Sequence, residues 1–261
     1  MNKKKRTEAV TPPALLERLV LSAGEEVVLV GGQALGFWLQ YFGVALPPDE
    51  VAVSADTDFL TRSAADKPVV ERFADVMGGR SLFPSDRALT ALVGQAYFDI
   101  SDDEFINVDV VFKVLGIKAE TVRAHAVRVA HGTRSFLVMH PLHVLLSRQV
   151  NLYKLAEKQT PKGVMQMAMA IDMAREFLRA EAVSIKSGGQ AARSPLQAMV
   201  SEIERMAKSD GGRKIARRYA LHVADVIDPS LIPAGAFWTK RWPSLRKLMS
   251  PAYAQQFAAP A

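Results

Sequence analysis

The sequence predicts a mixed α/β fold, in which a sheet flanked by helices is followed by a helical C-terminal region. Three observations predict this class. Short runs rich in β-branched residues alternate with segments of helical periodicity over residues 11–140. The turn-prone stretch SDDE separates two such runs, which is typical of an antiparallel strand pair. From Pro141 onward, apolar residues recur mainly at helical spacing.

The first elements follow one another directly. A helix is expected after Thr11, where two prolines precede an apolar helical pattern. The run Val27 to Val30 predicts a short strand, which Gly31 and Gly32 end. Apolar residues over 34–42 then recur at helical spacing. This segment therefore predicts a strand, a glycine turn and a helix in succession.

The remaining elements continue this alternation up to Pro141. Expected in order are a helix over 65–78 and strands over 92–100, 105–115, 126–130 and 134–139. Beyond Pro141, two helical segments precede a loop expected over 184–194, and the last third is expected to be helical. We accordingly divide the chain into a disordered basic tail (1–10), a core domain (11–140) and a helical domain (141–261).

The composition is that of a globular protein. Of the 261 residues, 49% are hydrophobic and 23% are charged, which allows one large domain or two modest ones. The chain has no cysteine, which excludes disulfides and thiolate metal sites. No apolar run reaches the roughly 18 residues of a membrane span, and none follows the basic start as a signal peptide would. We therefore expect a cytoplasmic protein with no membrane partner.

The net charge of +6 favours polyanionic partners such as RNA, DNA or nucleotides. Basic residues gather over 3–6 and again over 205–218 and 240–247. The late clusters suit an acceptor of the size of an RNA, although solvated helix faces explain them nearly as well.

Two like charges stand close together in the stretch SADTDFLTR, residues 54–62. In an extended strand, Asp56 and Asp58 point to the same face with Cα atoms about 6 to 7 Å apart. They repel one another unless one takes up a proton or a cation lies between them. Mg²⁺ prefers such carboxylate oxygens. A solvated turn is the alternative interpretation, because Asp and Ser are common turn residues.

A third carboxylate lies within an apolar strand. In FINVDVVFKVL the apolar side chains at 106, 108, 110 and 112 share one face, while Asn107 and Asp109 lie on the other. A charge in such a strand is rarely buried without a partner. An edge strand with a solvated Asp109 is the alternative. A site shared with Asp56 and Asp58 explains the charge better.

The glycine turn, the strand with Asp56 and Asp58 and the strand with Asp109 together indicate one kind of chemistry. A glycine turn at a helix start offers backbone N–H groups and a positive dipole end to a phosphate. Three carboxylates suit two divalent ions, one on a triphosphate and one activating an attacking hydroxyl. In-line nucleotidyl transfer needs this combination.

The motifs VGGQAL, ADTDFL and VDVVF, in this order, resemble the pattern of the nucleotidyltransferase superfamily. That pattern is an apolar residue, Gly, then Gly or Ser, followed by Asp-x-Asp or Asp-x-Glu and a third acidic strand residue. More closely, the chain is similar to the AbiEii-like group of bacterial nucleotidyltransferase toxins, over roughly residues 10–180. The resemblance implies a nucleotidyltransferase-type sheet within 11–140.

The resemblance also implies roles for the residues of the motifs. Gly31 and Gly32, with Gln33, would cradle the nucleotide phosphates. Asp56 and Asp58 would bind both Mg²⁺ ions, and the third acid, Asp109, would help one ion to lower the pKa of the acceptor hydroxyl.

Basic residues outside the motifs are candidates for contacting the triphosphate. Arg148 and Lys154, on the helix that follows the sheet, are expected to bind the nucleotide, and a solvated helix face is their alternative interpretation. Arg62 is a weaker candidate.

The activity that the resemblance implies is Mg²⁺-dependent transfer of a nucleoside monophosphate from an NTP to RNA, such as tRNA, or to a protein hydroxyl. It also implies a growth-inhibiting toxin with a cognate antitoxin, and a small-molecule acceptor stays open. Relatives often carry Lys before the first Asp and Ser or Thr in the glycine turn, where this chain has Ala55 and Gln33. An inactive nucleotide- or RNA-binding module with the same fold is therefore one alternative, and a helical interaction scaffold is another.

Overall fold

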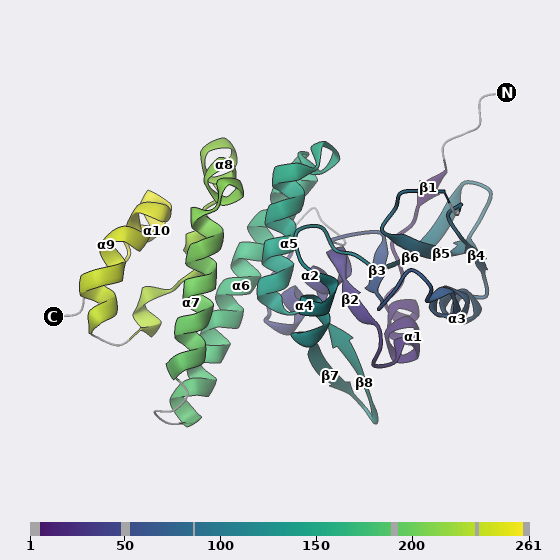
Figure 1. Cartoon of the computed structure of the whole chain (residues 1–261), viewed down its shortest axis with the longest axis horizontal. Helices are drawn as coiled ribbons and strands as arrows, with labels where there is room; N and C mark the ends of the chain where they lie inside the picture. The colour runs from purple at the N-terminus through teal and green to yellow at the C-terminus, as the bar shows by residue number, and fades with distance from the viewer. Residues whose placement is uncertain (1–5, 48–52, 86, 189–192, 233–234, 258–261) are drawn as a thin grey trace. The chain divides into compact units, whose positions relative to one another are not determined.

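The computed structural model describes residues 6–47, 53–85, 87–188, 193–232 and 235–257. The chain forms two compact units. The first comprises Met1–Gln40 and Ala45–Ser147, and the second comprises Tyr41–Val44 and Arg148–Ala261. The strands belong to the first unit and the longest helices to the second (Figure 1).

Within the described residues, eight strands form one mixed sheet in the first unit. Their order is β4-β5-β6-β3-β2-β8-β7, and β1 pairs with the start of β6. At the centre, β3 runs parallel to β6 and antiparallel to β2. The bounds are β1 Thr7–Glu8, β2 Val28–Val30, β3 Thr57–Leu60, β4 Arg80–Leu82, β5 Leu92–Asp99, β6 Glu104–Val111, β7 Val127–His131 and β8 Arg134–Val138.

Helices complete the first unit, and their apolar faces explain their positions. The helix α3 buries Val69, Val70 and Phe73, at helical spacing, against β5 and β6. The ring of Phe73 lies 4.5 Å from that of Phe59 on β3. The helices are α1 Pro13–Ala23, α2 Gly31–Tyr41, α3 Lys67–Met77, α4 Ala119–Ala124 and the first part of α5 Pro141–Lys154.

The expected mixed α/β class with a helical C-terminal region is confirmed. The strand pair around SDDE is antiparallel, as predicted, because the two runs are close in sequence and joined by a turn. The predicted basic tail needs a correction, since residues 6–10 are ordered. Arg6 contacts Asp99 at 2.6 Å, and Thr7 and Glu8 pair with β6. Residues 1–5 lie outside the described part of the chain.

Three histidines gather at the start of α5 in the first unit. The ring of His143 lies 5.5 Å from that of His125 and 5.6 Å from that of His140, centroid to centroid. The Nδ1 atom of His140 accepts a hydrogen bond from the Leu142 N–H group at 3.2 Å. The pKa of His140 is lowered to about 4, mainly because the ring is buried and to a smaller extent because His143 and His125 lie nearby.

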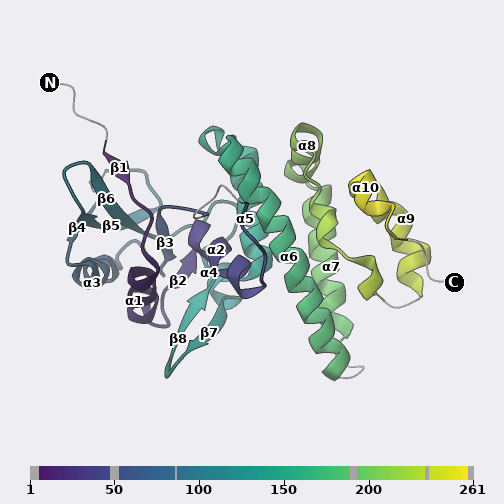
Figure 2. The same cartoon turned by 180° about the vertical axis from the view of Figure 1, so that it is seen from behind.

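The second unit is helical, and α6 and α7 lie side by side in it (Figure 2). Met167, Met169 and Met173 of α6 are buried, as expected for core side chains. The loop predicted from residue 184 begins later, because α6 continues to Gly188; residues 189–192 lie outside the description. The elements are η1 Ala156–Lys158, α6 Pro161–Gly188, α7 Arg193–Lys208, α8 Asp210–Tyr219, η3 Val223–Val226, η4 Pro229–Leu231, η5 Phe237–Arg241, α9 Trp242–Leu245, η6 Arg246–Leu248 and α10 Pro251–Ala254.

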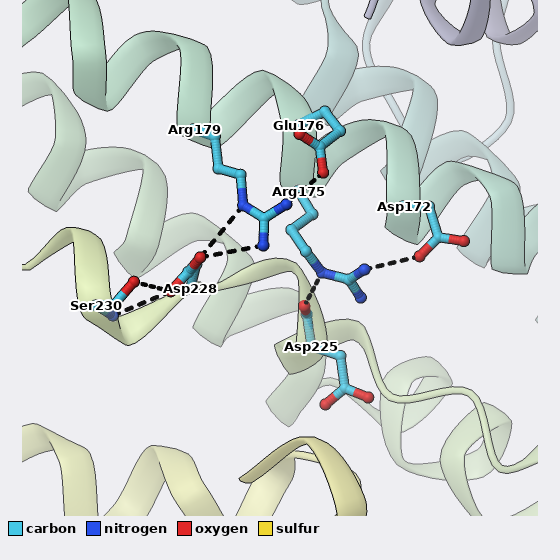
Figure 3. A network of polar contacts seen from close by, with 7 residues as sticks. All are labelled: Asp172, Arg175, Glu176, Arg179, Asp225, Asp228 and Ser230. Atoms are coloured by element: carbon cyan, nitrogen blue, oxygen red, sulfur yellow. Dashed lines mark hydrogen bonds and ion pairs between the residues drawn. The ribbon is translucent and has the colours of Figure 1, made fainter. Parts of the chain in front are cut away.

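Two arginines of α6 hold the short helical turns that follow α8 (Figure 3). Arg175 Nε donates to the Asp225 carbonyl oxygen at 2.8 Å. Arg179 contacts the buried carboxylate of Asp228 at 3.2 Å. Asp228 also accepts hydrogen bonds from the backbone and side chain of Ser230. The network therefore ties η3 and η4 to the long helix.

In the part of the chain that the structure describes, no helix combines the length and the apolar character that crossing a membrane requires.

Candidate active site

The register of β3 and β6 brings two of the predicted acids together. Asp58 and Asp109 are directly paired residues of these parallel strands. Paired residues of neighbouring strands point to the same face, and the strands lie about 4.8 Å apart. The two carboxylates therefore share one face of the sheet, although 50 residues separate them in the chain. Asp56 lies just before β3, which begins at Thr57.

Asp109 is held by two amide side chains. Gln95 Nε2 on β5 and Asn107 Nδ2 on β6 both donate to Asp109 Oδ1, at 2.8 Å and 2.7 Å. Burial raises the pKa of Asp109; these hydrogen bonds oppose the rise, and the negative charge of Asp56 adds to it. Asp56 is thus close enough to Asp109 for its charge to raise the pKa of Asp109.

The glycine turn lies directly against the acids. Gly31 has φ +68° and opens α2, and a Cβ atom there would lie 1.9 Å from Asp58 Oδ2. A Cβ atom on Gly32 would lie 2.2 Å from the Ser54 Cβ atom. A larger residue would displace the Asp58 carboxylate at the first position and the Ser54 side chain at the second. Both glycines are therefore required by the close approach of these segments.

The segment before β3 is anchored by polar contacts. Ser54 is buried, and its hydroxyl donates a hydrogen bond to Asp56 Oδ1. Gln33 Nε2, on α2, donates to the Ser54 carbonyl oxygen at 3.1 Å. The predicted nucleotide-binding residue Gln33 thus also links the glycine turn to the Asp56 segment.

The predicted basic residues lie elsewhere in the chain. Arg148 and Lys154 belong to the second unit, on the later part of α5. Arg148 is buried, with Nη1 donating to Gln166 Oε1 at 3.3 Å, so it does not lie on a solvated helix face. Lys154 is exposed. Arg62 is exposed, and its backbone N–H donates to Asp66 Oδ2 at 3.0 Å.

The sequence reasoning missed Ser54, Gln95 and Asn107, the side chains that hold the acids. Asn107 carried a signal, because it shares a strand face with Asp109 two residues away. Gln95 carried none, since only the pairing of β5 with β6 places it opposite Asp109.

The donor set suits a hard divalent cation. Carboxylate oxygens are the ligands that Mg²⁺ prefers, and proteins usually hold it with one or two carboxylates together with substrate phosphates. Asp58 and Asp109 supply two such carboxylates on neighbouring strands. Among the described residues, no three or more His, Cys, Asp or Glu side chains are arranged so that they could hold a metal ion. Any ion here would thus depend on oxygen ligands from a bound substrate.

Comparisons with known proteins found similar solved structures. No family model matches the chain. No curated protein matches it either. The solution structure of the antibiotic-resistance factor ANT(2'')-Ia is similar over 79% of this chain and 92% of that one, with 13% sequence identity and a TM-score of 0.38.

Proposed function

We propose that this protein is a Mg²⁺-dependent nucleotidyltransferase, which moves a nucleoside monophosphate from an NTP to an acceptor hydroxyl on RNA, such as tRNA, or on a protein. The observation that carries the proposal is the pairing of Asp58 with Asp109 beside the Gly31 turn. The helix start favours a phosphate, and the two carboxylates beside it favour a cation.

Each residue of the proposed site has a role in this reaction. Asp58 and Asp109 would hold the ion together with oxygens of the triphosphate, and Asp56 would lie beside them. The backbone N–H groups at Gly31 and Gly32 bind phosphate oxygens, because no side chain stands in their way. Mg²⁺, when bound, offsets the charge of the phosphates and promotes ionisation of the acceptor hydroxyl.

Three further residues are proposed to bind the nucleotide. Gln33 lies next to the glycine turn and holds the segment that leads to Asp56. Arg148 and Lys154 are proposed from the sequence alone, because positive charge suits a triphosphate. Arg148 would first have to leave its buried contact with Gln166.

The biological role proposed is that of a toxin paired with a cognate antitoxin. Only the sequence resemblance to the AbiEii-like group supports it. Induced expression should arrest growth, and expression of the Asp58→Ala variant should not. Normal growth on induction of the wild-type protein, at a level visible by immunoblot, would contradict the toxin role and leave the chemistry to be tested separately.

Label transfer tests the chemistry. The protein is incubated with each α-labelled NTP, Mg²⁺ and either total RNA or cell protein, and transfer to RNA or protein is measured. Asp58→Ala and Asp109→Ala should each abolish transfer, whereas Asp172→Ala, an exposed carboxylate in the second unit, should transfer normally. Equal labelling by wild type and Asp58→Ala would refute the proposed site.

A second candidate function is an inactive nucleotide-binding module with the same fold. Ala55 motivates it, because relatives often place a Lys there. This module would bind NTP in calorimetry without transferring label to any acceptor. Binding that is unaffected by Asp109→Ala would favour it over the enzyme.

A further inference from the structure

Two amide groups from different strands converge on one oxygen of Asp109. Gln95 reaches it from β5 and Asn107 from β6, at 2.8 Å and 2.7 Å. Gln95 and Asp109 are directly opposite in the antiparallel pair, and Asn107 shares the Asp109 face of β6. Oδ1 therefore has two donors, while Oδ2 has no hydrogen-bond donor among the described residues.

The contact of Asn107 with Asp109 leaves the amide oxygen of Asn107 without a hydrogen-bond partner among the described residues. The residue is 7% exposed, and its Oδ1 atom is buried without a hydrogen-bond partner in the described part of the chain. An unsatisfied buried acceptor destabilises a fold, and an apolar residue of similar size would avoid it. Turning the amide over would not help, because its oxygen would then face Asp109 Oδ1. The position thus provides a donor to Asp109 at the expense of its own oxygen.

We propose that Gln95 and Asn107 are positioning residues, which fix the rotation of the Asp109 carboxylate. With Oδ1 occupied by two N–H groups, Oδ2 is the oxygen left to bind an ion or accept a proton. The two amides thereby define which atom of Asp109 faces the substrate. This inference rests on the proposed function, since it assigns a task to a residue of the same site.

Both donors restrain the rotation of the same carboxylate, so the loss of one should change the effect of losing the other. Two residues that only pack in the core would not be coupled in this way. If either amide is lost, the other still restrains the carboxylate. If both are lost, the carboxylate can rotate and its burial is uncompensated. The effects of Gln95→Met and Asn107→Leu should therefore not be independent.

Binding of Mn²⁺ is the readout, because Mn²⁺ replaces Mg²⁺ and is visible by electron paramagnetic resonance. It is titrated into the full-length protein with a non-hydrolysable NTP analogue. Gln95→Met and Asn107→Leu should each weaken Mn²⁺ binding by about tenfold, and the double variant by more than about a hundredfold. Thermal unfolding is measured on every variant. Asn107→Leu should melt no lower than wild type, since it removes the orphaned oxygen.

A buried amide in the second unit provides the matched control. Gln149 Nε2 donates to the Met206 carbonyl oxygen at 3.0 Å. Gln149→Met loses two hydrogen bonds, the second to Ser209 Oγ at 2.9 Å, although it also removes an amide oxygen that has no hydrogen-bond partner among the described residues. It should therefore lower the melting temperature and leave Mn²⁺ binding unchanged. If Gln95→Met fails to fold, Gln95→Asn withdraws the amide by one methylene and takes its place.

The possible outcomes distinguish a failure of the positioning role from a failure of the proposed function. If wild type binds Mn²⁺ with the nucleotide and the folded double variant binds it equally well, the positioning role is wrong and the proposed function stands. If wild type binds no Mn²⁺ with any NTP analogue, the proposed function fails, and the positioning role fails with it. Weaker binding that merely follows lower melting temperatures, as in Gln149→Met, also overturns the positioning role.

Discussion

Replacing Gly31 with alanine should disable the site more than it destabilises the fold. A Cβ atom at this position would lie 1.9 Å from Asp58 Oδ2, whereas real contacts of this kind are not closer than 3.0 Å. The carboxylate must therefore move by about 1 Å, a displacement that typically reduces catalysis about a hundredfold. The left-handed backbone at φ +68° adds about 1 to 2 kcal/mol of strain.

Gly78 offers a control with the same backbone conformation. It also has φ +68°, at the end of α3 in the first unit, and a Cβ atom there would meet no atom within 4 Å. Gly78→Ala should therefore lose about 1 to 2 kcal/mol of unfolding free energy and keep full activity. The difference between the two variants isolates the displacement of Asp58 from the strain of the backbone.

The assays are urea unfolding and label transfer from NTP, or Mn²⁺ binding if no acceptor is yet identified. In an Asp58→Ala background, the nearest side-chain atom of residue 58 would be its Cβ, at 3.0 Å. The stability cost of Gly31→Ala should then approach that of Gly78→Ala. Equal activity of Gly31→Ala and Gly78→Ala would refute the reasoning, because it would mean that the position of Asp58 does not matter.

Three further predictions concern protonation, stability and the Asp56 segment. Because folding lowers the pKa of His140 to about 4, the unfolded state takes up a proton first as the pH falls, and about 3 kcal/mol of unfolding free energy should be lost between pH 6.5 and 4. His140→Asn keeps a helix-capping acceptor and should flatten this part of the stability curve; an unchanged slope in urea unfolding would exclude His140 as its source. Asp228→Ala should cost about 2 kcal/mol of unfolding free energy, because Asp228 is buried in the network of Figure 3. Asp172→Ala, which removes an exposed ion pair, should cost less than about 0.5 kcal/mol. Similar costs for the two variants would show that the buried contacts of Asp228 do not stabilise the fold. Ser54→Ala removes the donor to Asp56 Oδ1 and should lower kcat/KM about tenfold with little change in melting temperature; a normal kcat/KM would mean that this hydrogen bond does not orient Asp56.

Local patterns were sufficient for the central strands of the sheet and for the faces of those strands. The antiparallel pair β5 and β6 is close in sequence, so a turn signal between two β-rich runs predicts it. The alternation of β6 correctly assigned Asn107 and Asp109 to one face and Val108 and Val110 to the other, although Asn107 is buried as well. The ordered tail was missed, since Thr7 and Glu8 carry no strand pattern and pair only because β6 lies beside them.

Only the part of the candidate site that depends on local spacing was predicted. Local spacing identified Asp56, Asp58 and Asp109 as candidates and Gly31 as a turn residue. It gave no indication that Arg148 is buried against Gln166, because helical periodicity does not reveal which neighbour covers a face.

The sequence by itself determined which side chains share a face, because the side chains of a strand alternate with a period of two residues. Only the tertiary structure decided which faces meet. The parallel pairing of β3 with β6 places Asp58 beside Asp109, although 50 residues separate them in the chain. The register of β5 with β6 places Gln95 opposite Asp109. Such pairing depends on the combined packing of the sheet, since a shift by a single residue would turn Asp109 to the opposite face.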